Sequence, residues 1–251
     1  NDNGLTFDAS TVRGNLAATA TAGNITGGPL TITGTTTLVT SADDATIDLA
    51  GSSNYTDALT ITTNGTGTTV IITSPSALVI AESTISGEAT FKSSTSISDR
   101  GTVTVGGKLS ALTTANNGDI NLDTLAVDGT IGVQTHGTGS ATVVNDNGLT
   151  FLGATVGGAL SATATRGNIA DDNSTGGALA IPGTTTLVTS ADNATIALDT
   201  TTNRFTGAVT ITTNDGSGTD ADVTIDGGTT ALILAASTID GDLTVRSGHA
   251  S

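Results

Sequence analysis

Three groups of closely spaced aspartates are the residues best placed to do chemistry. They are Asp43-Asp44, Asp171-Asp172 and Asp220-Ala221-Asp222. A glycosidase holds two carboxyl groups across a sugar, one of them with a raised pKa. These pairs, however, lie in polar, turn-like segments without aromatic rings, and Asp is a favoured turn residue. We therefore interpret them as solvated turn residues, with a carbohydrate-active enzyme (a polysaccharide lyase or hydrolase) as the alternative.

The two histidines, His136 and His249, are the other candidates for acid-base work. The chain has no Cys, and no Gly-x-Ser-x-Gly motif occurs, so the partners of a nucleophilic triad are missing. We interpret both histidines as solvated loop residues. The sequence thus predicts no catalytic residue, and we expect a protein that is not an enzyme.

A short motif that suggests calcium binding occurs twice, at 1–4 and 145–148, as Asn-Asp-Asn-Gly. It is similar to the start of an EF-hand loop, but the closing Glu is absent. The Gly-Gly-x-Gly-x-Asp signature of calcium-binding β-helix repeats is absent too. We expect no cofactor-binding residue and no dedicated metal site, so that any bound Ca²⁺ would be adventitious.

Threonines recur in pairs that would share one face of a strand. The pairs are Thr31 and Thr33, Thr60 and Thr62, Thr102 and Thr104, and Thr210 and Thr212. Flat arrays of such hydroxyl groups can bind ice, although Thr also serves simply as a soluble strand former. Ala, Asp and Asn interrupt these arrays, so ice binding is a third and weaker hypothesis.

The composition restricts both the fold and the partners. Aromatic residues make up 2% of the 251 residues, so the core must be built from stacked Val, Ile, Leu and Ala. The formal net charge is −16, which repels phosphate backbones and anionic lipid. We therefore expect no nucleic-acid partner.

No apolar run is long enough to span a membrane, and we expect no membrane insertion. The lack of Cys suits a bacterial protein exported unfolded, and we expect secretion or display on the cell surface.

A long repeat divides the chain. The seven residues 1–7 recur letter for letter at 145–151, and the ten residues 34–43 recur at 183–192. The offset grows from 144 to 149 where polar residues are inserted, as expected for loops that lengthen on a fixed scaffold. We predict one β-solenoid over 1–251, with an internal duplication of 1–144 and 145–251 in which the second copy is shorter.

A short repeat lies inside the long one and indicates the fold class. Apolar residues alternate with polar ones in short runs, which predicts strands, and turn-like positions separate the runs. These positions fall at 14, 34, 57, 87, 107, 129, 158, 183, 207 and 241, a mean spacing of about 25 residues. We predict an all-β, parallel β-solenoid of about ten coils, each of roughly 20–30 residues. Two β-sandwiches are the structural alternative.

The repeats resemble those of large filamentous-haemagglutinin-like bacterial exoproteins. The resemblance lies in segments such as 10–16 (Ser-Thr-Val-Arg-Gly-Asn-Leu), 30–38 (Leu-Thr-Ile-Thr-Gly-Thr-Thr-Thr-Leu) and 154–160 (Ala-Thr-Val-Gly-Gly-Ala-Leu). It implies a right-handed parallel β-helix at the cell surface that acts in adhesion or as a stalk. The N-terminal secretion domain of that family is not recognisable in this sequence.

These observations lead to one principal hypothesis. We expect a non-enzymatic structural or adhesive surface module, a rigid acidic rod. The repeat is interrupted at the C-terminus, so either a longer protein continues there or molecules stack head to tail through their terminal coils. The expected partners are further copies of the chain and a cell-surface or carbohydrate ligand.

Overall fold

The computed structural model describes residues 3–173, 177–214, 216 and 220–248. These residues form 28 strands in three sheets and no helix. Every pairing between the strands is parallel, which excludes the β-sandwich alternative. The predicted parallel β-solenoid is therefore confirmed.

The strands alternate between the sheets as the chain winds around the axis. Sheet 1 contains β1 (Leu5–Phe7), β4 (Ile25–Gly27), β7 (Ile47–Leu49), β10 (Thr69–Ser74), β12 (Glu88–Ser93), β14 (Leu109–Asn116), β16 (Thr130–His136), β18 (Leu149–Thr155), β20 (Ile169–Asp171), β21 (Leu179–Ile181), β23 (Ile196–Leu198), β24 (Arg204–Phe205), β26 (Val223–Asp226) and β28 (Leu243–Arg246). Sheet 2 contains β3 (Leu16–Ala20), β6 (Thr36–Asp43), β9 (Leu59–Asn64), β11 (Leu78–Ile85), β13 (Ile97–Val105), β15 (Ile120–Val127), β17 (Ala141–Asn145), β19 (Leu160–Ala164), β22 (Thr185–Asp192), β25 (Ala208–Asn214) and β27 (Ile233–Leu234). Sheet 3 contains β2 (Ser10–Val12), β5 (Leu30–Ile32) and β8 (Asn54–Tyr55).

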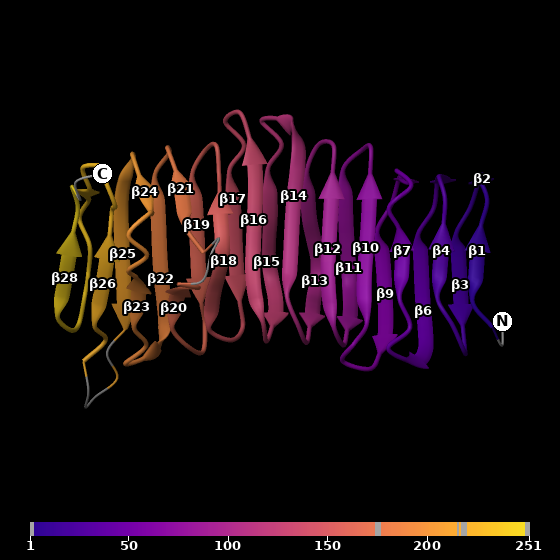
Figure 1. Ribbon diagram of the computed structural model, residues 1–251, viewed down its shortest axis with the longest axis horizontal. Coiled ribbons are helices and arrows are strands. Elements are labelled where there is room, and N and C mark those ends of the chain that lie inside the picture. Colours follow the sequence, from indigo (N-terminus) through magenta and orange to yellow (C-terminus); the bar gives the residue numbers. More distant parts are fainter. Residues whose placement is uncertain (1–2, 174–176, 215, 217–219, 249–251) are drawn as a thin grey trace.

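The molecule is an elongated rod, with β1 and β28 at opposite ends of its long axis (Figure 1). The main path of sheet 1 takes eleven steps from β1 to β28. These steps span 238 residues, from Leu5 to Leu243, or about 22 residues per turn. At the usual spacing of parallel strands, eleven steps give a rod of about 53 Å.

One continuous apolar core fills the rod. Strands such as β10 and β17 alternate between buried and partly exposed residues, because successive side chains in a strand point to opposite faces. Parallel pairing in register then places the buried side chains of one turn on those of the next. The largest buried side chains are Phe91, Phe151 and Phe205. Burying a side chain of this kind contributes about 1.5–3 kcal/mol.

The turns number eleven rather than ten because the turn-like positions lie on two different corners. Positions 14, 34, 57, 158, 183 and 207 precede strands of sheet 2, whereas 87, 107, 129 and 241 precede strands of sheet 1. Three of the nine intervals therefore pass from one corner to the other and cover more than one turn. Counting these intervals as single turns makes the average turn about 25 residues instead of about 22.

The long repeat corresponds to a whole number of turns. β6 and β22 have the same sequence and the same burial pattern, and they lie seven steps apart in sheet 2. β1 and β18, which contain the last three residues of the other repeated segment, lie seven steps apart in sheet 1. Because the repeat spans a whole number of turns, equivalent residues face the same side of the rod.

The cross-section changes at β18. In the centre of the rod each turn has two long strands, such as β14 and β15. β18 pairs with β16 on one side, but on the other side its first half pairs with β20 and its second half with β21. A register shift between Ile131 and Gly132 accompanies this division. Sheet 1 thus forks at β18, and this fork shapes the outer surface described below.

Candidate functional site

Asparagines and aspartates at the corners of one turn hold the backbone of the next turn. In each case the side-chain oxygen accepts a hydrogen bond from the main-chain N–H at the corresponding place one turn later. The pairs are Asn15–Thr35 (3.0 Å), Asn24–Thr46 (2.9 Å), Asp119–Ser140 (2.8 Å), Asn168–Thr195 (2.8 Å) and Asp222–Asp242 (2.8 Å). These residues therefore fix the register between turns, and Asp222 is one of them.

The pair Asp43-Asp44 also has a structural role at a corner. Asp44 has a left-handed backbone with φ 60°, and its Oδ1 accepts a hydrogen bond of 2.7 Å from the N–H of Gly67. Asp43 ends β6 and its Oδ1 accepts a hydrogen bond from the amide of Asn64. Asp and Asn tolerate the left-handed region better than most residues. Both side chains are exposed, as predicted, and Asp44 lies in a turn, but Asp43 ends a strand rather than lying in the turn itself.

Asp171 differs from what the sequence predicts. It ends β20 and is buried, with 6% of its surface exposed, so its interpretation as a solvated turn residue is wrong. Its Oδ2 accepts hydrogen bonds from the side-chain amide of Asn203 (2.7 Å) and the N–H of Thr200 (3.2 Å). The burial depends on Asn203, which lies 32 residues away. Asp172 is partly buried at the following corner, and Asp220 is exposed.

His136 is exposed, as predicted, but it ends strand β16 rather than lying in a loop. Its Nδ1 lies 2.8 Å from the carbonyl oxygen of Thr113 in the previous turn. His249 lies outside the described residues. His136 thus takes part in the contacts between turns. Among the described residues, no carboxylate lies within hydrogen-bonding distance of its ring.

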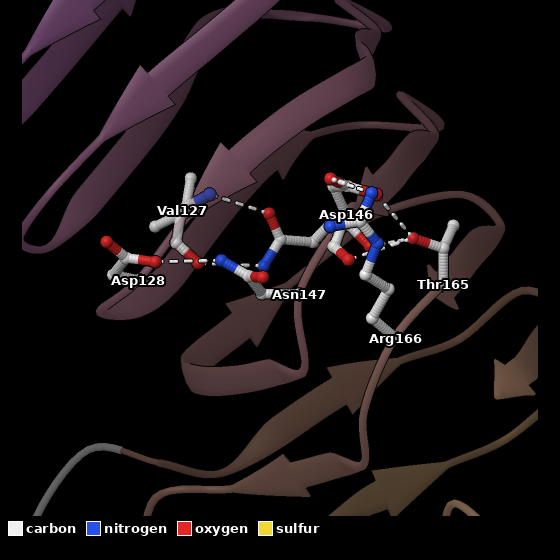
Figure 2. Close-up of polar contacts among 7 residues, drawn as sticks. Val127, Asp128, Asp146, Asn147, Thr165 and Arg166 are labelled. Carbon is white, nitrogen blue, oxygen red and sulfur yellow. Dashed lines mark hydrogen bonds and ion pairs between the residues drawn. The ribbon is translucent and has the colours of Figure 1, made fainter.

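The polar side chains of the Asn-Asp-Asn-Gly segment at 145–148 each contact different neighbouring residues (Figure 2). Asn145 is buried and exchanges two hydrogen bonds with the main chain of Val127. Asp146 lies 3.3 Å from Arg166 and accepts a hydrogen bond from Thr165. Asn147 donates 2.7 Å to Asp128.

This arrangement leaves no common point for a cation at 145–148. Of the matching segment 1–4, residues 1 and 2 lie outside the described residues. A group of three or more His, Asp or Glu side chains able to hold a metal is likewise not found in the described parts of the chain.

The fold perturbs the ionisation of Asp99. Burial raises the pKa of its carboxyl group above the ordinary value, although hydrogen bonds from the main chain of Thr124 and Asp123 and from the Thr124 hydroxyl oppose the shift. These bonds measure 2.9, 3.1 and 3.0 Å. Asp99 thus fastens β13 to β15 at a point where a register shift leaves main-chain N–H groups to be satisfied.

A shallow trough on the outside of sheet 1 is the best candidate for a binding site. One column of outward-facing side chains crosses six strands of this sheet, from β12 to β24. The column consists of Lys92, Leu112, Gln134, Thr155, Ala180 and Arg204, each paired with the next. Beside it runs a second column of Thr90, Ser110, Gly132 and Gly153. The trough lies where the second column changes to glycines.

The fork at β18 and the two glycines, Gly132 and Gly153, which have no side chain, together create the hollow. Around Gly132 the depression has a volume of about 360 Å³, and a neighbouring depression of about 260 Å³ shares Thr155 with it and extends to Arg204. A Cβ atom added to Gly132 would have no neighbour closer than 3.8 Å. Packing therefore does not require glycine at this position, and its effect is to leave space on the surface.

The chemistry of the trough differs from that of the rest of the molecule. The side chains of Thr90, Ser110, Gln134 and Thr155 line it, and within the described residues they make no hydrogen bond. Arg204 is the one charged residue among the described residues that line the two depressions. Lys92 lies at the other end of the first column. Both cations are exposed, and neither belongs to an ion pair in the described chain.

The sequence patterns did not single out these residues. Lys92 and Arg204 are far apart in the chain, and their shared column depends on five successive strand registers. The one sequence feature that points to the trough is Gly132, a glycine at an outward position of a strand in which buried and exposed residues alternate.

The threonine pairs lie on the outside of the strands, as expected, but they do not form an unbroken array. On sheet 2, Thr186 pairs with Thr210 and Thr84 pairs with Thr104. Register shifts between Ala81 and Ser83, and between Ser98 and Val103, interrupt the columns. The array is therefore divided into short patches.

The fold defines the class: this is a parallel β-solenoid repeat protein. The chain belongs to a family described as repeats of unknown function (DUF5649), whose model matches residues 1–63, 67–136 and 138–212. At about 22 residues per turn, each match covers about three turns of the solenoid. No curated protein and no solved structure matches the chain. The described residues contain no helix long and apolar enough to cross a membrane.

Proposed function

We propose that the chain is a non-enzymatic structural and adhesive module, a stiff acidic rod that acts outside a bacterial cell in the manner of filamentous-haemagglutinin-like exoproteins. The observation that carries this proposal is the stacking of eleven turns around one apolar core. In such a solenoid each turn contacts only its neighbours, so length can be added without a new core. That property suits a stalk or spacer.

The distribution of charge supports the same role. The formal net charge of −16 keeps rods apart laterally, because like-charged surfaces repel. Acids are concentrated at the corners, where Asp44 and Asp119 hold neighbouring turns together. The flat faces between the corners remain available for contact with other molecules.

Copies of the chain associate end to end in this proposal. β27 and β28 are the outermost strands of their sheets in the described chain, and they expose Ile233, Leu234, Leu243 and Val245. Turns of a second copy, stacked in the same register, would cover these side chains and pair with the open strand edges. Sedimentation velocity over a range of concentrations tests this part. Leu243→Lys should weaken the association, whereas Thr244→Lys, on the outward side, should weaken it less.

Labelling of intact cells tests the proposal most directly. An antibody against the purified rod should stain unpermeabilised source cells, and external protease should remove the stain. Stain that appears only after permeabilisation would contradict a surface role. In parallel, purified rod should release no new reducing ends from a panel of polysaccharides and should show no thermal hysteresis. Cleavage would favour the enzyme alternative, and hysteresis would favour ice binding.

A further inference from the structure

We infer that the trough on sheet 1 binds a linear acidic polysaccharide, which lies along the rod axis between Lys92 and Arg204. This inference rests on the proposed adhesive function and identifies the class of ligand. The two cations are five steps apart in one column, a distance of about 24 Å at the usual strand spacing. Two fixed positive groups at that separation match anionic groups carried at intervals along an extended polymer.

The charge around the trough favours an anion even though the whole chain is acidic. Three cations lie at outward positions on this face between β10 and β24, namely Lys92, Arg204 and Lys108, which directly precedes β14. Glu88 is the acid at the outward positions of these strands, and it lies 3.6 Å from Lys108. Asp172, at the corner after β20, is a further acid near the rim. Asp199 lies at the matching corner one turn later, so acids border the face, but the outward positions of its strands carry two cations, Lys92 and Arg204, against one acid, on a protein of net charge −16.

The hydrogen-bonding groups favour a sugar over a peptide. In β12 and β14, beneath the trough, the main-chain groups pair in register with neighbouring strands over most of their length, so they offer little to a peptide backbone. The side chains of Thr90, Ser110, Gln134 and Thr155 are free of hydrogen bonds in the described structure. Hydroxyl and amide groups can both donate and accept, which suits the hydroxyl groups of a sugar.

Calorimetric titration with two acidic polymers, polygalacturonate and dextran sulfate, tests the inference. Methyl-esterified polygalacturonate and unsulfated dextran are the matched neutral polymers. We expect at least one acidic polymer to bind and the neutral polymers to bind at least about tenfold more weakly, since the charge-assisted contacts would be lost. Binding of the carboxylated or the sulfated polymer alone would identify the anionic group. Failure of both, or equal binding of the neutral polymers, would overturn the inference.

Binding by two variants tests whether the ligand occupies the trough. The double variant Lys92→Gln/Arg204→Gln should lower the affinity about tenfold or more. The control Arg13→Gln/Arg100→Gln changes the net charge equally at positions away from the trough and should bind normally. Gly132→Thr should also weaken binding because it fills the depression, yet the added Cβ meets no atom within 3.8 Å, so the fold should be retained. Equal loss in the control variant would show that binding is only a response to net charge.

Two further measurements separate this inference from the proposed function. Poly-glutamate should bind at least about tenfold more weakly than the acidic sugar, and equal binding would show that the ligand is any polyanion. The length of the polysaccharide should not change during incubation. Cleavage would contradict the non-enzymatic function itself. Absence of binding by a protein that still stains the cell surface would overturn the polysaccharide inference alone.

Discussion

The side-chain amide of Asn145 pairs with both main-chain groups of Val127. Its Oδ1 accepts a hydrogen bond of 2.8 Å from the N–H of Val127, and its Nδ2 donates 2.9 Å to the carbonyl oxygen of the same residue. The same Nδ2 also donates 2.6 Å to the carbonyl oxygen of Gly148. A side chain thus takes the place of a strand partner where sheet 2 turns a corner.

Replacing Asn145 with Leu should therefore destabilise the rod strongly. The substitution leaves both main-chain groups of the buried Val127 without their partner, and each buried unpaired group costs about 1–3 kcal/mol. We expect a loss of about 2–4 kcal/mol in the free energy of unfolding, measured by urea denaturation. Asn147→Ala is the control, because that side chain contacts Asp128 on the exposed surface and should cost less than about 1 kcal/mol. Equal costs for the two variants would contradict this role.

The glycine at position 183 should not tolerate a methyl group. A Cβ atom there would lie 2.4 Å from the carbonyl oxygen of Gly158, which occupies the same corner one turn earlier. Gly183→Ala should cost about 1–3 kcal/mol, since a turn must move to relieve the overlap. Gly14 precedes a strand of the same sheet, but its added Cβ would meet no atom within 4 Å. Thermal unfolding of Gly14→Ala should consequently resemble that of the unchanged chain.

Tyr55 provides a spectroscopic probe of the core. Burial raises the pKa of its hydroxyl group to about 12, whereas an unfolded tyrosine has a pKa of about 10. Between these values the folded chain keeps a proton that the unfolded chain releases, so stability falls as the pH rises from about 10 to about 12. Tyr55 is the one tyrosine and the chain has no Trp, so phenolate absorbance follows it directly. Ionisation near pH 10 in the folded rod would show that Tyr55 is accessible to water.

Asp99 should make stability depend on pH in the acid range. Its raised pKa means that the folded state holds a proton at pH values where the unfolded state has lost it. Stability conferred by this group is therefore highest below the ordinary carboxyl pKa and declines as the pH rises through the raised value. The difference in unfolding free energy between the unchanged chain and Asp99→Asn should decline in the same window. An NMR titration that places the Asp99 carboxyl at or below its ordinary pKa would refute this.

The sequence predicts the solenoid well because the fold is repetitive. Residues such as Leu38 and Leu187 occupy identical segments, and both are fully buried in sheet 2. Alternation and repetition are local signals, so they can be recognised without coordinates. The two corners, in contrast, use the same turn residues, and only the strand that follows Gly107 or Gly183 shows which corner each occupies.

The candidate site could not be predicted for a physical reason. The burial of Asp171 depends on Asn203, and the column from Lys92 to Arg204 depends on registers that shift at the fork. Such relations between distant residues are set by packing, and no short pattern in the chain encodes them. The insertion near Asp171, which raises the offset between equivalent segments from 144 to 149, is the one sign in the sequence that the cross-section changes near this point.

Spin-label distances along one outward column of sheet 2 test the stacking itself. The chain has no Cys, so pairs of cysteines can be introduced and labelled selectively. Val79 and Thr210 lie six steps apart in this column, and Asn121 and Thr210 lie four steps apart. Electron paramagnetic resonance should give separations of about 29 Å and about 19 Å, a constant increase per turn. Separations that do not grow with the number of turns would contradict a parallel, in-register solenoid.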